Sequence, residues 1–93
     1  MTDKNLVDSV VEELRTMARS GDSASSLLRR IQQLAGMTNC ELLSVQCFHR
    51  AFGGGVAAIS PIGGWAGFGG DLGDMQIDNF LSSVLDGYRK AVE

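Results

Sequence analysis

The side chains that could carry out acid–base or nucleophilic chemistry are one histidine, His49, and two cysteines, Cys40 and Cys47. His49 is the only histidine, and no serine or cysteine is placed beside it by a known catalytic pattern. On a helix the two cysteines would lie about 10 Å apart, which is too far for a disulfide. We therefore expect buried, reduced thiols and a structural histidine. Neither a Cys-x-x-Cys pair nor a histidine cluster is present to form a metal site.

A glycine-rich run, Gly67-Phe-Gly-Gly-Asp-Leu-Gly73, could in principle hold a phosphate at the start of the last helix. Its spacing matches neither the dinucleotide-binding motif nor the P-loop, and Asp71 and Asp74 would repel an anion. Asp71, Asp74 and Asp78 could instead converge on a cation, but they lack the alternating acidic pattern of a calcium loop. The sequence therefore predicts no cofactor and no metal, and it argues against an enzyme.

The residues best suited to binding a partner are aromatic or acidic and lie late in the chain. Trp65 is the only tryptophan and is flanked by glycines, so it either fills the core or forms a hot spot with Phe68. No Lys or Arg lies between Arg50 and Arg89, whereas four aspartates do: Asp71, Asp74, Asp78 and Asp86. They predict an acidic outer face on the last helix. This face is either simply solvated or a site for a basic partner.

Two amphipathic helices are predicted to begin the chain. The first runs from a Thr2 or Asp3 cap to Gly21, with apolar residues at helical spacing: Leu6, Val7, Val10, Val11, Leu14, Met17 and Ala18. The second runs from an Asp22 or Ser23 cap to Gly36, and its apolar stripe is Leu27, Leu28, Ile31, Leu34 and Ala35. The short connection between them predicts an antiparallel helical hairpin.

The segment from residue 38 to 60 fits two structures. Thr38-Asn-Cys-Glu41 has the form of a capping box, after which Leu42, Val45, Phe48 and Phe52 share one helical face. Alternatively, residues 43–47 alternate as a strand, and three glycines at 53–55 could turn into a second strand. The helix is preferred. We therefore predict a mostly α fold, a small bundle of four main helices, with an α+β fold containing a short hairpin at 42–60 as the alternative.

Glycine dominates the segment between Phe52 and the last helix. Residues 56–59 could form one helical turn, Pro61 biases Ser60 toward an extended conformation, and residues 63–70 are predicted to be an irregular loop. The last helix should begin with Gly73 as N-cap and Gln76 at N3, inside a Leu72–Ile77 hydrophobic staple. Its apolar stripe is Ile77, Phe80, Leu81, Val84, Leu85, Tyr88 and Val92.

Length and charge set wider limits. The 93 residues are expected to form a single domain, 1–93, and the net charge of −3 argues against direct contact with nucleic acid. The N-terminus leads directly into an amphipathic helix and not into a signal peptide, so we expect a cytoplasmic protein. Residues 51–70 are uncharged, but their many glycines make a membrane-spanning helix unfavourable.

Three short motifs resemble one family of bacterial proteins. They are Phe48-His-Arg-Ala-Phe-Gly53, Pro61-Ile-Gly-Gly-Trp65 and Asp71-Leu-Gly-Asp-Met-Gln-Ile-Asp78. Together, over about residues 42 to 85, they are similar to immunity proteins of contact-dependent growth inhibition and related polymorphic toxin systems.

The resemblance implies an inhibitor that binds the toxin domain of a cognate effector and occludes it. Such toxins are often nucleases, so the implied partner is a basic protein surface. The expected contacts are Trp65, Phe68, Asp71, Asp74 and Asp78, with Asp86 at the periphery. The alternative function is a small helical regulatory or inhibitor protein that acts on transcription or another nucleic-acid machine. Monomer and homodimer both remain open.

Overall fold

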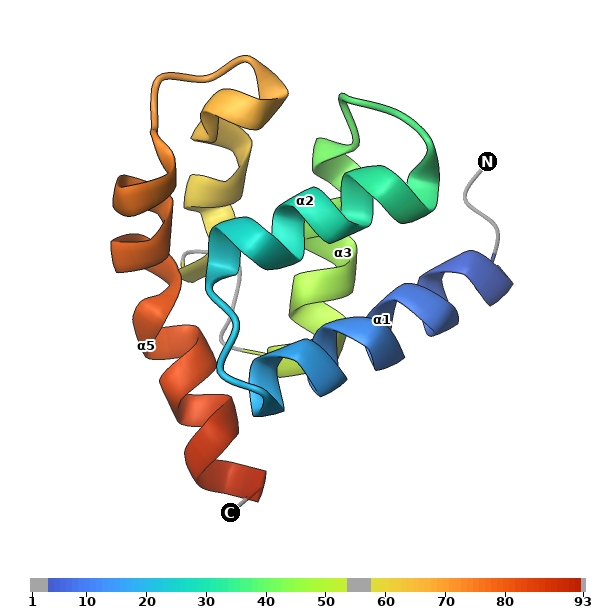
Figure 1. Ribbon diagram of the computed structural model, residues 1–93, viewed down its shortest axis with the longest axis vertical. Helices are drawn as coiled ribbons and strands as arrows, with labels where there is room; N and C mark the ends of the chain where they lie inside the picture. Colours follow the sequence, from blue (N-terminus) through green and yellow to red (C-terminus); the bar gives the residue numbers. More distant parts are fainter. Residues whose placement is uncertain (1–3, 54–57, 93) are drawn as a thin grey trace.

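Helices account for the architecture of this protein, whose computed structural model describes residues 4–53 and 58–92. The main elements are α1 (Lys4–Arg19), α2 (Ala24–Ala35), α3 (Glu41–Phe52) and α5 (Asp74–Val92), shown in Figure 1. Two short 3-10 helices, η1 (Ser60–Gly64) and η2 (Ala66–Phe68), precede α5. The predicted bundle of four main helices is confirmed. The hairpin alternative is wrong because Glu41–Phe52 is helical. Its proposed turn at residues 53–55 and the start of its second strand fall largely on residues 54–57, which lie outside the described residues.

The first two helices form the predicted hairpin and run in roughly opposite directions (Figure 1). In α1, Val7, Val10, Val11, Leu14 and Ala18 are buried at helical spacing. Ser23 caps α2, where its side chain accepts a hydrogen bond from the backbone N–H of Ser26. Gly36 ends α2 in the left-handed conformation and donates its N–H to the Gln32 carbonyl at 3.0 Å. The caps expected at Thr2 or Asp3 lie outside the described residues.

The start of α3 differs from the predicted capping box. The N-cap residue is Cys40 and makes no side-chain cap hydrogen bond; the Ser44 hydroxyl instead donates to the Cys40 carbonyl at 2.9 Å. The buried residues of α3 are Ser44, Cys47, Phe48 and Ala51. The helix is therefore rotated relative to the predicted face, and Leu42, expected to be in the core, is 84% exposed. Small Ser44 and Ala51 on the inner face permit close packing of neighbouring helices.

The glycine-rich segment is compact, which corrects the prediction of an irregular loop. Ser60 begins η1 and is not extended. A parallel bridge joins Trp65 and Leu72, with hydrogen bonds from Ala66 N to Leu72 O and from Leu72 N to Gly64 O at 2.7 and 2.8 Å. Glycine is required at two places by close approach. A side chain at Gly67 would overlap the Trp65 ring, and one at Gly70 would overlap the Gly64 carbonyl.

The last helix begins as predicted, since the Gly73 N–H donates to Gln76 Oε1 at 2.9 Å. Ile77, Leu81, Val84 and Leu85 are buried along α5, but Phe80 is 54% exposed and so is not a core residue. At the other end, Arg89 donates from Nε to the Ala18 carbonyl and from Nη2 to the Asp22 carbonyl, each at 2.8 Å. These bonds fasten α5 to the turn between α1 and α2.

Both cysteines are buried and free, as predicted. Burial raises the pKa of the Cys47 thiol to about 11, so the thiol stays protonated at neutral pH. Within residues 4–53 and 58–92, none of the helices is long and apolar enough to cross a membrane.

Candidate functional site

The six residues predicted to contact a partner do not form one surface. Trp65 is only 1% exposed and is among the largest fully buried side chains. Phe68 is half-buried and packs edge-on against it, with ring centroids 5.0 Å apart. Of the two alternatives for Trp65, the structure shows the core one, so its expected contact with a partner is not available. The glycines around it let η1 and η2 pack closely around the indole ring.

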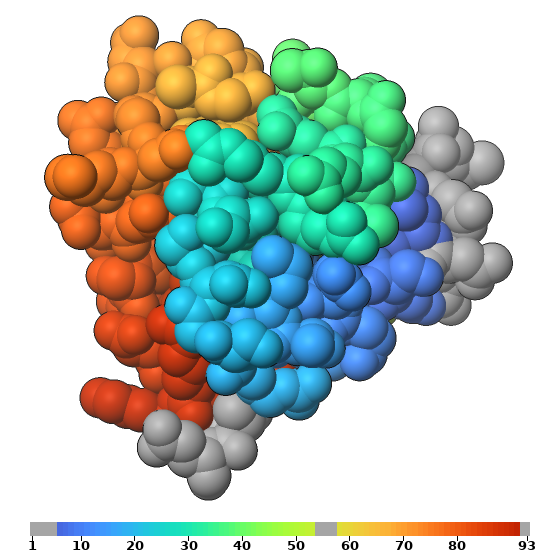
Figure 2. Space-filling view, in the orientation of Figure 1, coloured from blue at the N-terminus to red at the C-terminus, as the bar shows by residue number. Residues whose placement is uncertain are grey.

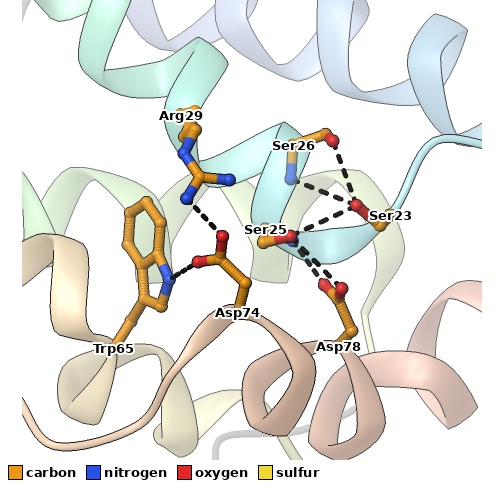
Figure 3. A network of polar contacts seen from close by, with 7 residues as sticks. All are labelled: Ser23, Ser25, Ser26, Arg29, Trp65, Asp74 and Asp78. Atoms are coloured by element: carbon orange, nitrogen blue, oxygen red, sulfur yellow. Dashed lines mark hydrogen bonds and ion pairs between the residues drawn. The ribbon is translucent and has the colours of Figure 1, made fainter.

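Asp74 provides the polar contact of this buried tryptophan (Figure 3). The Trp65 indole N–H donates to Asp74 Oδ1 at 2.9 Å, and Arg29 of α2 forms an ion pair with Asp74 Oδ2. The Arg29 guanidinium also lies over the Trp65 ring, 5.5 Å from its centroid. The hydrogen bonds from Arg29 and Trp65 lower the pKa of Asp74 below its usual value. Asp74 thus joins α5 to α2 and to Trp65, which lies between η1 and η2.

Asp78 caps the neighbouring end of α2. Its Oδ1 accepts the Ser25 backbone N–H at 2.8 Å, and its Oδ2 accepts the Ser25 hydroxyl at 3.2 Å (Figure 3). A carboxylate at a helix N-terminus satisfies unpaired N–H groups and interacts favourably with the helix dipole. The two aspartates one turn apart on α5 therefore hold α5 against α2.

The remaining acidic residues of the predicted face are separate from this network. Asp86 pairs with Arg89 one turn along α5, with the nitrogen and oxygen 3.5 Å apart. Asp71 is exposed in the connection before α5. Of the four aspartates expected on the acidic outer face, Asp71 and Asp86 are exposed, whereas Asp74 and Asp78 bind residues of α2.

Arginines elsewhere in the molecule are also paired with carboxylates. Besides Arg29 and Arg89, the ion pairs among the described residues are Arg15–Glu12, Arg30–Glu13 and Arg50–Asp8. Arg15 also donates to the carbonyls of Ala51 and Arg50 at 3.2 and 3.1 Å, at the end of α3. Much of the charge of this chain is therefore used to hold its own helices together.

A different surface stands out at the opposite end of α2. We define the neutral end as residues 32–42, which cover the last turn of α2, the connection to α3 and the first turn of α3, together with η1 and η2. It forms the green and gold top of the molecule in Figure 2. Three large apolar side chains are exposed on the first part: Leu34 by 37%, Met37 by 55% and Leu42 by 84%.

Gln32 joins the two parts of the neutral end. Its side-chain amide donates to the carbonyl of Thr38 at 2.8 Å and to that of Gly67 in η2 at 3.0 Å. Beside it lies an open depression of about 340 Å³ lined by Arg29, Gln32, Gln33, Gly36, Met37 and Thr38. The connection between α2 and α3 is thus fixed against η2, with the depression and Met37 side by side.

The neutral end carries almost no charge. Residues 31–40 and 58–70 contain no Asp, Glu, Lys or Arg, so Glu41 is the one charged residue in the parts that define this end. The Glu41 carboxylate lies against η1, since a Cβ added at Gly63 would be 2.6 Å from its Oε1. This surface was missed by the sequence predictions. The charge-free run 31–40, which contains Leu34 and Met37, was a signal that could have indicated it.

The structure places the remaining reactive residues apart. His49 is exposed in the last turn of α3, whereas Cys40 and Cys47 are buried. Among the described residues, no group of three or more His, Cys, Asp or Glu side chains is arranged to hold a metal ion. Comparisons of the chain with protein-family models, with curated proteins and with solved structures gave no match.

Proposed function

We propose that this protein is a binding module that neutralises a bacterial toxin domain by covering it, as an immunity-type inhibitor. One observation carries the binding part of this proposal. Leu34, Met37 and Leu42 are exposed within nine residues of chain, around the connection between α2 and α3. Single exposed apolar residues are common, but several gathered on one surface are typical of an interaction site.

The energetics are consistent with such a role. Fully burying a Leu or Met side chain contributes about 1.5–3 kcal/mol, and Leu42 is almost fully exposed. A small number of such residues commonly provides most of the binding free energy of an interface, while the surrounding contacts exclude water. Inhibition by occlusion needs an interface of roughly 800 Å² per partner and no catalytic group.

The toxin-directed part of the proposal rests on the three motifs in residues 48–53, 61–65 and 71–78. Residues of these motifs build the framework around Trp65: Phe48 and Trp65 are buried, and Asp74 and Asp78 bind α2 residues. The resemblance therefore concerns the framework, while the exposed apolar residues lie largely outside the motifs. If the protein acts in this way, it works in the cytoplasm, where the toxin domain would reach its target.

The test is co-expression of the chain with the C-terminal domain of a large secreted protein that the tagged chain retains from a lysate of its own host. We expect the chain to restore growth to cells that express this toxin domain, and native mass spectrometry of the mixture to show a one-to-one complex. An unrelated toxin domain is the control and should remain toxic. Continued growth arrest, with the chain abundant and helical by circular dichroism, would contradict the proposal.

A further inference from the structure

We infer that the neutral end docks onto an uncharged, apolar surface of the protein partner, and not onto a basic one. This inference rests on the proposed function and deepens it by naming the chemistry of the partner surface. It replaces the expectation that an acidic helix attracts a basic toxin cleft. Three properties of the described residues support it: the internal pairing of charges, the composition of the neutral end and its fixed shape.

The first property is that three of the four aspartates expected to attract a basic partner are already engaged, while Asp71 is exposed. Asp74 binds Arg29 and Trp65, Asp78 binds Ser25, and Asp86 pairs with Arg89. A partner cation that approached α5 would have to compete with these intramolecular donors. Removing Asp74 or Asp78 from its contacts would also leave buried or helix-terminal N–H groups without an acceptor. Electrostatic attraction at this face is therefore weak.

The second property is the lack of countercharge at the neutral end. A charged partner group buried against Leu34, Met37 and Leu42 would lose its hydration. Glu41 is the one charged residue of the neutral end, and Arg29, which lines the neighbouring depression, is already paired with Asp74. Apolar side chains meet no such penalty. The polar groups available beside them are side-chain amides and hydroxyls, such as Gln33, Thr38 and Asn39, which suit uncharged hydrogen-bonding groups of a partner. The complementary surface is accordingly apolar at its centre and uncharged.

The third property is shape. The bonds from Gln32 to Thr38 and Gly67 hold the connection in place before binding, which reduces the entropy lost on association. Leu42 projects from the first turn of α3, and Met37 borders the depression of about 340 Å³. Methionine adapts to irregular apolar surfaces because its side chain is unbranched and flexible. The neutral end thus offers an exposed leucine on α3 and, between α2 and α3, a recess bordered by the flexible Met37.

The experiment measures the dissociation constant for the toxin domain that the wild-type chain neutralises, by calorimetry at 50 and 500 mM NaCl. The test variant is Met37→Gln with Leu42→Gln, which keeps these exposed positions uncharged. The matched control is Met75→Gln with Phe80→Gln, because these residues are 78% and 54% exposed on α5. A second control, Asp71→Asn with Asp86→Asn, tests the acidic residues. Circular dichroism checks that every variant is folded.

We expect the neutral-end variant to bind roughly 30-fold more weakly, both controls to bind within threefold of wild type, and salt to change the wild-type constant less than threefold. A loss confined to either control pair, or a wild-type affinity that falls tenfold or more in high salt, would overturn this inference while leaving the proposed function intact. A wild-type chain that binds no toxin domain would overturn both, and the growth assay would show it independently.

Discussion

Replacing Asp74 by alanine removes the acceptor of a buried indole N–H and one partner of an ion pair in a single step. Trp65 is 1% exposed, and its Nε1 donates to Asp74 Oδ1 at 2.9 Å. A buried donor left without an acceptor costs about 1–3 kcal/mol. The Arg29–Asp74 pair adds little, about 0–1 kcal/mol, because the two side chains remain 53% and 43% exposed. The free energy of unfolding should therefore fall by about 2 kcal/mol.

This loss is large for a chain of 93 residues, whose stability is expected to be about 5–14 kcal/mol. It corresponds to a decrease in Tm of about 10 °C. Urea unfolding can be followed by the fluorescence of Trp65, the only tryptophan, and in parallel by far-UV circular dichroism. Agreement of the two transitions would justify a two-state analysis.

Two matched variants separate the contributions. Asp74→Asn keeps an oxygen acceptor for the indole but loses the charge, so it should cost only about 0.5–1 kcal/mol. Asp71→Ala changes an exposed aspartate nearby and should lie within about 0.5 kcal/mol of wild type. If Asp74→Ala were no more destabilising than Asp71→Ala, the contact with Trp65 would not contribute to stability and the reasoning would be refuted.

Three further outcomes are expected. Gly70→Ala should lower the free energy of unfolding in urea by about 1–3 kcal/mol, because the new Cβ would overlap the Gly64 carbonyl. Gly87→Ala should raise it by about 0.5–1 kcal/mol, because a Cβ at this position of α5 meets open space. Equal effects of the two substitutions would contradict the close approach at Gly70. Asp78→Ala should cost about 1–2 kcal/mol by thermal unfolding, since the N-terminus of α2 loses its acceptor, and an unchanged Tm would argue against this cap. The pKa of Asp74 in the folded protein is lowered from 3.8, so the ionised carboxylate stabilises the fold above pH 3.8. This stabilisation should be lost as the pH falls below 3.8. The urea midpoint of wild type should therefore decrease in that range, and the midpoint of Asp74→Asn should not show this decrease. Parallel pH profiles for the two proteins would refute the assignment.

Helical periodicity and end signals were sufficient to predict most of the secondary structure. The stripes of α1 and α5, the Ser23 and Gly36 caps of α2, and the Gly73–Gln76 cap all depend on residues close together in sequence. Interactions of this range are local, so each can be recognised from a short window of residues. The choice of helix for Glu41–Phe52 was correct, but the capping box that favoured it is absent, because Cys40 is the N-cap and makes no side-chain cap hydrogen bond.

The roles of the aspartates and of Trp65 were decided only by tertiary structure. In the sequence, Asp74 and Asp78 are typical of an acidic helix surface. Their partners in the structure, Arg29 and Ser25, lie 45 and 53 residues away in the chain. Whether a carboxylate faces solvent or another helix depends on how the helices cross, which a linear pattern does not contain. The exposure of Leu42 was likewise not predictable from the sequence pattern. It depends on how α3 is rotated against its neighbours, which buries Ser44, Cys47, Phe48 and Ala51.

Helix periodicity, end signals and the low side-chain volume of glycine act locally, so they were sufficient to predict a helical domain with a glycine-rich segment around Trp65. Tertiary structure alone decided that this tryptophan is buried and that the charges are paired across helices. It also decided that the uncharged residues of two distant segments meet at one end. The physical reason is that solvation and pairing are properties of the packed molecule: the free energy of a side chain depends on what surrounds it in space.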